Sequence, residues 1–201
     1  ICGDIGIMGA NYMVVEYGGT AVRAMSVDER MTLTNMAAEL GAKTGIIAAD
    51  ETTAEMLAAA GAGDVDINAW QGDEDAPVAR TIDIDGPVLG PQVAAPTSPE
   101  NAAEVAEHAG MSLGQAYIGA CTGAKLEDLR MAARVVRGRK IAANTRFFVA
   151  PASILIHEAA AVDGTLKILE DAGATILPTG CGGCIGLGPA RLDEDMIGIS
   201  T

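Results

Sequence analysis

The chain has 201 residues, 49% of them apolar and 20% charged, so it can form one large domain or two small lobes, and neither disorder nor a disulfide-held miniprotein is expected. Charged residues or glycines interrupt every apolar run before the roughly 20 residues that a membrane helix needs, so no membrane partner is expected. No nucleic acid partner is expected either, because the net charge is -14 and only 3% of the residues are aromatic.

Strands and helices are predicted to alternate near the N-terminus. Ser26 and Glu29 have the spacing of a capping box, and Gly41 can end the helix that they begin. Asp50 can cap a second helix. In chain order we expect a strand over residues 12–17, a helix between Ser26 and Gly41, a strand over residues 44–48 and a helix from Asp50 to Gly61.

The middle of the chain is rich in Gly, Asp and Pro, which indicates a lobe boundary. One strand is predicted there, over residues 80–85, and Ser98-Pro99 is predicted to begin a helix, as a cap followed by proline. We therefore expect a partial α/β lobe over residues 1–80 and an α/β lobe over residues 81–201.

The second lobe alternates regularly and predicts an α/β fold with a mostly parallel sheet. Its expected elements are a strand over residues 115–120, a helix over 126–136, a strand over 146–150, helices over 154–162 and 165–172, and a strand over 174–177.

Three of the four cysteines follow strands of this lobe. Cys121 comes after the strand QAYIGA, and Cys181 follows the last strand and forms a C-x-x-C pair with Cys184. Binding crevices in parallel sheets lie at the carboxyl ends of the strands. Gly182 and Gly183 let the backbone wrap closely around a metal. The hypothesis is that three thiolates converge on one crevice.

Other interpretations of these thiols stay open. A thioredoxin-like pair needs a helix at the first cysteine, whereas residues 185–189 (IGLGP) form helices poorly. A structural zinc site needs four ligands, and His108 and His157, the only histidines, fall in predicted helices. Buried structural thiols are the third alternative, and Cys2 is expected to be a core residue.

Few cysteines and no visible signal peptide predict a cytoplasmic protein. The chain starts without Met and ends after an apolar run, so we expect an excerpt of a longer polypeptide. If the three thiolates hold a 4Fe-4S cluster, one iron lacks a protein ligand and can act as a Lewis acid in dehydratase chemistry.

Four segments carry a resemblance to a known family: residues 30–53 (RMTLTNMAAELGAKTGIIAADETT), 118–141 (IGACTGAKLEDLRMAARVVRGRKI), 149–153 (VAPAS) and 180–186 (GCGGCIG). Together they resemble the aconitase superfamily, most closely the large subunits of 3-isopropylmalate dehydratases and homoaconitases. The resemblance implies three-layer αβα lobes with mostly parallel sheets, of the aconitase iron-sulfur domain type.

The resemblance also implies roles for single residues. The 4Fe-4S cluster would be held by Cys121, Cys181 and Cys184. In the motif N-M-x-x-E-x-G, Asn35 would lie beside the cluster and Glu39 would serve as the catalytic acid or base, with both on one helical face.

The sequence departs from the family at one part of the site. The usual C-T-N is Cys121-Thr122-Gly123 here, so contacts of Thr122 and Gly123 with the cluster or substrate are in question. The upstream G-D-S-H-T and downstream N-R-N-F-x-G-R segments are absent, and so is the swivelling domain or small subunit that donates a serine base. Much of the substrate-carboxylate clamp belongs to those parts.

The implied function is part of the large subunit of a hydro-lyase that isomerises 2- and 3-isopropylmalate, in leucine biosynthesis. The expected partners are a small di- or tricarboxylate substrate and the small subunit or swivelling domain, and the chain alone is expected to be inactive. The alternatives are a homoaconitate hydratase, a dimethylmalate-type dehydratase and, in another class, a non-catalytic cluster- or zinc-binding module.

Overall fold

The structure, a computed structural model, describes residues 1–73 and 75–201 and divides into two compact units, Ile1–Ala109 and Gly110–Thr201. The sequence put the boundary between residues 80 and 81 instead. Residues 92–104 belong to the first unit because they pack on its N-terminus. The Glu100 carboxylate accepts a hydrogen bond from the Ile7 amide at 3.2 Å, and a Cβ on Gly3 would lie 2.8 Å from the Cβ of Ala102.

The N-terminal unit contains two small sheets, one parallel (β1 with β2) and one antiparallel (β3 with β4). Its α-helices and strands are α1 (Cys2–Ile5), β1 (Val14–Glu16), α2 (Thr20–Ala24), α3 (Val27–Met36), β2 (Thr44–Ile46), α4 (Glu51–Ala59), β3 (Gln92–Ala94) and β4 (Ala102–Glu104). Its 3-10 helices are η1 (Ala37–Leu40), η2 (Ile67–Trp70), η3 (Gly86–Val88) and η4 (Val105–His108).

The caps predicted in this unit are confirmed. The Ser26 hydroxyl accepts a hydrogen bond from the Glu29 amide, and the Glu29 carboxylate accepts one from the Ser26 amide, which closes the capping box of α3. Gly41 adopts a left-handed conformation (φ 75°) at the end of η1. The Asp50 carboxylate caps α4 by accepting from the Thr53 amide at 3.2 Å.

Two predictions for the middle of the chain are wrong. Residues 80–85 form no strand; they are exposed and pair with no other strand that the structure describes. Ser98-Pro99 begins no helix but lies in the turn between β3 and β4. The Asn101 side chain donates to the Pro96 carbonyl at 3.1 Å, and the Ala95 amide donates to the Asn101 carbonyl at 2.8 Å. These hydrogen bonds across the turn hold the chain in a hairpin, although Ser98-Pro99 has the local sequence of a helix start.

A buried ion pair joins α3 to the start of α4. The Arg30 side chain is 5% exposed, and its guanidinium donates to both carboxylate oxygens of Asp50, at 2.6 and 2.8 Å. It also donates to the carbonyls of Met25 and Arg23. The hydrogen bonds from Arg30 lower the pKa of the Asp50 carboxyl. Removal of the carboxylate would therefore leave a buried, unpaired cation.

We expect Asp50→Asn to lower the free energy of unfolding by about 3 kcal/mol, because asparagine keeps the cap but removes the partner charge of Arg30. Urea denaturation at neutral pH measures this change. The Asp50 contribution is present above the ordinary aspartate pKa of about 4 and is lost as the pH falls through the lower pKa of the folded state. The variant should therefore lose less stability than the wild type on acidification.

Asp171→Asn is the matched control, because Asp171 pairs with Lys167 in an exposed i, i+4 ion pair that water screens. Equal losses of stability in the two variants would contradict a special role for the buried pair.

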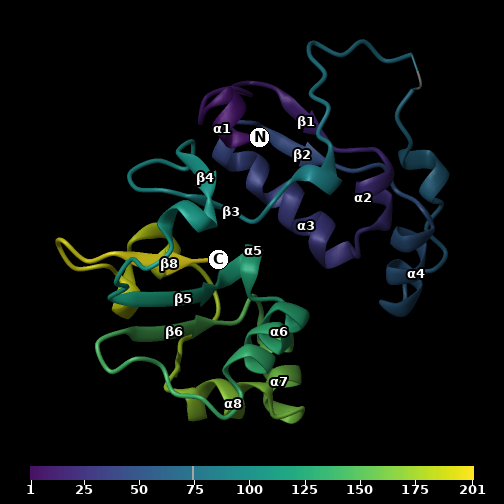
Figure 1. Cartoon of the computed structure of the whole chain (residues 1–201). Coiled ribbons are helices and arrows are strands. Elements are labelled where there is room, and N and C mark those ends of the chain that lie inside the picture. Colours follow the sequence, from purple (N-terminus) through teal and green to yellow (C-terminus); the bar gives the residue numbers. More distant parts are fainter. Residues whose placement is uncertain (74) are drawn as a thin grey trace. The chain divides into compact units, whose positions relative to one another are not determined.

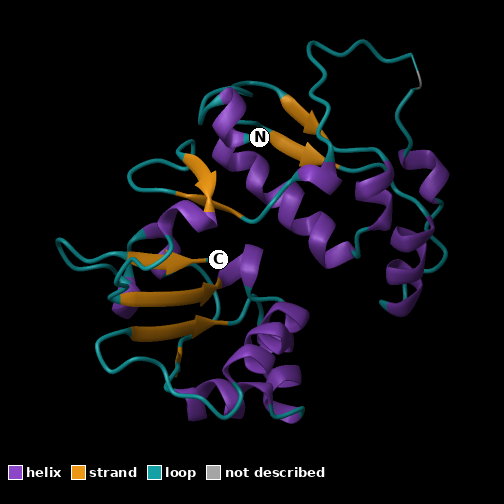
Figure 2. Ribbon diagram, viewed as in Figure 1, coloured by secondary structure: helices purple, strands orange, loops and turns teal. Residues whose placement is uncertain are grey.

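The C-terminal unit has one four-stranded parallel sheet in the order β7-β6-β5-β8 (Figure 2). Its elements are β5 (Gln115–Gly119), α5 (Ala120–Gly123), α6 (Leu126–Val136), β6 (Arg146–Ala150), α7 (Ile154–Val162), α8 (Thr165–Ala172), β7 (Thr175–Ile176), η5 (Gly183–Ile185), η6 (Gly188–Ala190) and β8 (Gly198–Ser200). The α/β fold with its parallel sheet is confirmed, and the predicted bounds of α6, β6, α7 and α8 match those observed.

Side chains alternate across this sheet and divide the unit into two apolar clusters. On one face, Phe147 and Val149 of β6 pack with Leu129 of α6 and Leu169 of α8, and Figure 1 shows α6, α7 and α8 gathered beside the strands. On the other face, Tyr117 of β5 packs in a cluster with Ala150 and Ala190. This second face carries the segment with two of the three candidate cysteines.

No helix that the structure describes combines the length and the apolar character needed to cross a membrane.

Candidate metal centre

Cys121 lies directly after the central strand of the C-terminal sheet. Strand β5 ends at Gly119, and Cys121 is the second residue of the short helix α5 that follows. Cys184 lies in η5, and Cys181 lies in the loop just before it. All three thiols are exposed and none is in a disulfide. The C-terminal unit therefore contains the whole set of cysteines predicted to bind a metal.

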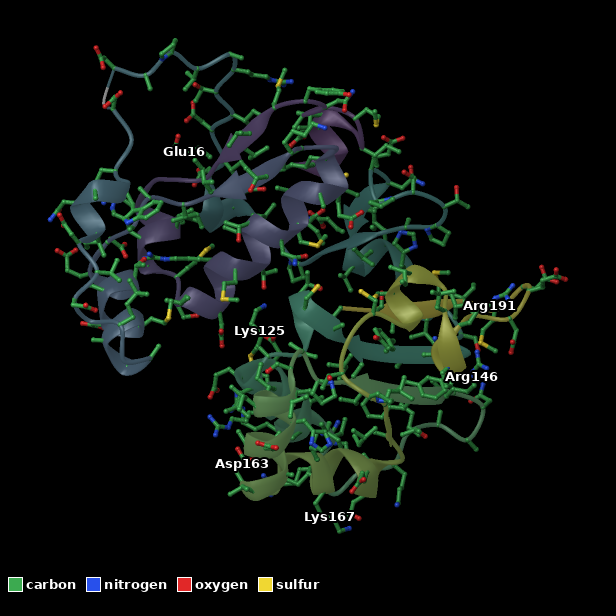
Figure 3. All side chains as sticks on the ribbon, turned by 180° about the vertical axis from the view of Figure 1, so that it is seen from behind. Glu16, Lys125, Arg146, Asp163, Lys167 and Arg191 are labelled. Atoms are coloured by element: carbon green, nitrogen blue, oxygen red, sulfur yellow. The ribbon has the colours of Figure 1, made fainter. Side chains whose placement is uncertain are left out.

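Hydrogen bonds from the sheet hold the segment that follows the C-x-x-C loop. The Gln115 amide nitrogen of β5 donates to the Ala190 carbonyl at 2.7 Å, and the Arg146 guanidinium of β6 donates to the Arg191 carbonyl at 3.1 Å (Figure 3). Gln115 is buried, so this contact is shielded from water. The return path of the loop is therefore fixed on the face of the sheet that carries Tyr117.

The C-x-x-C loop packs against the ring of Tyr117. A Cβ on Gly183 would lie 3.1 Å from Cε2 of that ring and 2.8 Å from the Cβ of Ala190, and one on Gly182 would lie 3.9 Å from the Tyr117 hydroxyl oxygen. A side chain at Gly183 would thus force a shift of the ring or of the backbone behind it. Glycine at this position allows the loop to approach the sheet closely.

A buried phenol lies beside the C-x-x-C loop. Burial, followed by the nearby groups of Cys184, Cys181 and Cys121, raises the pKa of Tyr117 to about 12. Tyr117 is only 3% exposed, and its hydroxyl has no hydrogen-bond partner of regular geometry among the described residues. A loose hydrogen-bonding contact with the Cys184 thiol contributes to the shift. Among the cysteines, Cys184 has the largest effect on the phenol, and its loop is the one that packs on the ring.

This donor set fits an iron-sulfur cluster. Cysteine thiolates are the usual ligands of such a cluster, all three cysteines are exposed, and the glycines between two of them let their loop lie close to the sheet. Within the described ranges, no group of three or more His, Cys, Asp or Glu side chains is close enough to hold a single metal ion. The geometry that a cubane cluster needs is different. Each thiolate binds a different iron atom, so the three sulfurs need not converge on a single point.

Contacts of Thr122 and Gly123 give a physical reason for the glycine in the Cys-Thr-Gly segment. The Thr122 carbonyl accepts a hydrogen bond from the buried Lys125 ammonium at 2.8 Å. A Cβ on Gly123 would lie 2.3 Å from both Cβ and Oγ1 of Thr201, and the Thr201 hydroxyl also contacts the carbonyl of Gly119 at 3.1 Å. The backbone of this segment is therefore bonded on both sides, and position 123 has no space for a larger residue in this conformation.

Asn35 and Glu39 belong to the N-terminal unit, and both are exposed. The α-helix ends at Met36, so Asn35 lies in α3 whereas Glu39 lies in the 3-10 helix η1. The expectation that both residues share one α-helical face is therefore corrected, because a 3-10 helix has three residues per turn. Their roles near the cluster remain predictions. Cys2, expected in the core, is half-buried, with its thiol 3.8 Å from the Glu39 carbonyl.

Tyr117, the residue on which the C-x-x-C loop packs, was not predicted from the sequence. A signal was present, since Tyr117 precedes Cys121 by four residues in a predicted strand and alternates with Ala116 and Ile118, which face the opposite cluster. Which face of the sheet receives the C-x-x-C loop depends on the chain path, and alternation alone does not give that path.

Comparisons with known proteins agree over the whole chain. The family model described as "Aconitase family (aconitate hydratase)" matches residues 1–201. The "3-isopropylmalate dehydratase large subunit 2" of Archaeoglobus fulgidus is 39% identical over 201 residues, which cover 100% of this chain and 48% of that protein. The "3-isopropylmalate dehydratase large subunit 1" of Pyrococcus furiosus is 43% identical over 186 residues, which cover 92% of this chain and 43% of that protein.

A third relative has a different name. The "Methanogen homoaconitase large subunit" of Methanocaldococcus jannaschii is 38% identical over 208 aligned residues, which cover 100% of this chain and 50% of that protein. The chain thus spans about half the length of the curated relatives that it matches.

Proposed function

Because the chain belongs to the aconitase family, we propose that it is part of the large subunit of an iron-sulfur hydro-lyase that interconverts 2- and 3-isopropylmalate. The observation that carries the proposal is the position of three exposed thiols in the C-terminal unit: Cys121 lies just beyond the end of β5, and Cys181 and Cys184 lie in the loop that packs on Tyr117. Homoaconitate is the alternative substrate, supported by the similarity to a homoaconitase large subunit.

In this proposal Cys121, Cys181 and Cys184 hold a 4Fe-4S cluster. When bound, the cluster supplies an iron without a protein ligand, which acts as a Lewis acid toward the substrate hydroxyl. The backbone of the Cys121 segment is held by the hydrogen bonds of Thr122 and Gly119, so the first thiolate sits on a fixed base. The glycines of the second loop keep its two thiolates close to the sheet.

Glu39 is the proposed acid and base of the dehydration. Its carboxyl group would deliver a proton to the hydroxyl oxygen as the carbon-oxygen bond breaks, and would take a proton from water in the reverse direction. The Asn35 amide would hold the cluster or the substrate in position by hydrogen bonds. The proton on the neighbouring carbon would then be removed by a partner, in line with the large-subunit names of the relatives.

The charge of the chain agrees with a separate partner. A dicarboxylate needs cationic groups to bind it, preferably bidentate arginines, whereas this chain carries a net charge of -14. We therefore assign most of the carboxylate clamp to the small subunit or to other parts of the large subunit. A reducing compartment such as the cytoplasm would keep the exposed thiols available for the cluster.

The direct test is isomerisation by the anaerobically reconstituted protein mixed with an isopropylmalate dehydratase small subunit. Product analysis should show 3-isopropylmalate formed from 2-isopropylmalate, and no turnover without the small subunit. The assay is repeated with homoaconitate, and preference for that substrate would favour the alternative. A protein that binds zinc, has no visible absorption and turns over neither substrate would contradict the proposal and favour a non-catalytic metal-binding module.

A further inference from the structure

The Tyr117 hydroxyl is a buried polar group that makes no hydrogen bond of regular geometry in the described part of the chain, and its one hydrogen-bonding influence is a loose one from the Cys184 thiol. Tyr117 as a whole is only 3% exposed, so water does not replace the missing partner. Buried polar groups almost always have a partner, because an unmade hydrogen bond leaves the cost of removing water uncompensated. A hydroxyl with only a loose contact to the Cys184 thiol can therefore donate to a better acceptor, and this thiol is itself a predicted cluster ligand.

The ring is fixed, so the position of the hydroxyl is fixed as well. Tyr117 lies on the central strand, paired with Phe148 of β6 on one side and Ser200 of β8 on the other. The ring lies over Gly119, where a Cβ would be only 2.5 Å from the hydroxyl oxygen. The side chain thus runs along the strand toward its carboxyl end, which is the end that Cys121 follows.

The C-x-x-C loop lies next to this oxygen. A Cβ on Gly182 would be 3.9 Å from the hydroxyl oxygen, and glycine places no side chain there between the loop and the ring. A phenol is a good donor at neutral pH, and a neutral thiol is a weak acceptor. Sulfide and thiolate sulfurs carry negative charge and accept hydrogen bonds more strongly.

We propose that the Tyr117 hydroxyl donates a hydrogen bond to a sulfur of the cluster held by Cys121, Cys181 and Cys184. This inference rests on the proposed function, since it assumes that the three thiols bind a cluster. Tyr117 is then a positioning residue, which acts on the reaction through the cluster and does not touch the substrate. Hydrogen bonds to sulfur raise the reduction potential of such clusters and help to retain them.

Tyr117→Phe tests the proposal, because it removes the oxygen and keeps the ring on which the loop packs. In the protein without cluster, the variant should be at least as stable as the wild type in thermal unfolding, because the lost hydroxyl had no partner. In the reconstituted protein, it should release iron to a chelator about tenfold faster, as expected for loss of a hydrogen bond to a charged group. Tyr17→Phe is the control: it also removes a tyrosine hydroxyl, but burial alone raises the pKa of Tyr17, with no contribution from a cysteine.

Two further readouts identify the hydrogen bond itself. In the wild type, exchange into deuterated water should shift the iron-sulfur vibrations in the resonance Raman spectrum, and the reduction potential should be higher than in Tyr117→Phe. In the variant, the part of the isotope shift that comes from the phenol proton should be lost. Unchanged vibrations, potential and release rate in Tyr117→Phe would overturn the inference, as would a large loss of stability in the protein without cluster.

Failure of this inference can be told apart from failure of the proposed function. A wild-type protein that takes up no iron and sulfide would overturn both. A wild-type protein that takes up the cluster and isomerises its substrate, together with a Tyr117→Phe variant of identical spectra, would overturn only the role of Tyr117.

Discussion

Replacement of Cys184 by serine should leave a folded protein that no longer retains an iron-sulfur cluster. Thiolate is the ligand that these clusters use, and a serine hydroxyl is a much harder and less acidic donor. The residue lies at the surface in η5, so its replacement should not disturb the core. Iron and acid-labile sulfide per protein should fall to background, visible absorption should disappear, and isomerase activity should disappear with it.

The control for this experiment is Cys2→Ser, which changes the only cysteine outside the C-terminal unit. It should keep the iron content, the sulfide content and the spectrum of the wild type. Full cluster content in Cys184→Ser, or an equal loss in both variants, would contradict the assignment of Cys184 as a ligand.

Glu39→Gln should lower kcat by about 10² to 10⁴-fold, the range typical for loss of a general acid or base. The amide has nearly the shape of the carboxyl group but neither delivers nor accepts the proton. Because Glu39 is exposed at the surface of its 3-10 helix, stability and cluster content should stay unchanged. Steady-state kinetics on the reconstituted enzyme with its small subunit, together with the visible spectrum, measure both effects.

Glu55→Gln provides the comparison, since Glu55 is an exposed carboxylate in α4 of the same unit. It should turn over at the rate of the wild type. If Glu39→Gln did the same, Glu39 would have no part in the chemistry, and the proton would have to come from a residue elsewhere in the large subunit or from its partner.

Local patterns predicted most of the C-terminal unit. The predicted bounds of α6 and α8 match those observed, and both helices carry local signals: α6 is amphipathic, and α8 lies between Gly164 and Gly173. The order of these elements was enough to predict the parallel sheet. In each case the residues that determine the element lie within it or next to it in the sequence.

Elements that depend on a distant partner were not predicted. Ser98-Pro99 has the local chemistry of a helix start, but the pairing of β3 with β4 makes it a turn. Strand β8 was missed because its identity depends on pairing with β5 across the whole unit. The cysteine pattern and the resemblance predicted Cys121, Cys181 and Cys184 as ligands, whereas the place of Tyr117 required the three-dimensional path of the loop that covers it.

The exposure of all three thiols affects when the proposed cluster can be inserted and replaced. The C-terminal unit builds its core from apolar residues on both faces of the sheet, and none of the three cysteines belongs to either cluster. If the three thiols hold the proposed cluster, this unit can fold first, and a carrier protein can then deliver the cluster to the folded chain. Exposed thiols are also accessible to oxidants. Because the site is at the surface, a damaged cluster could be replaced without synthesis of a new polypeptide.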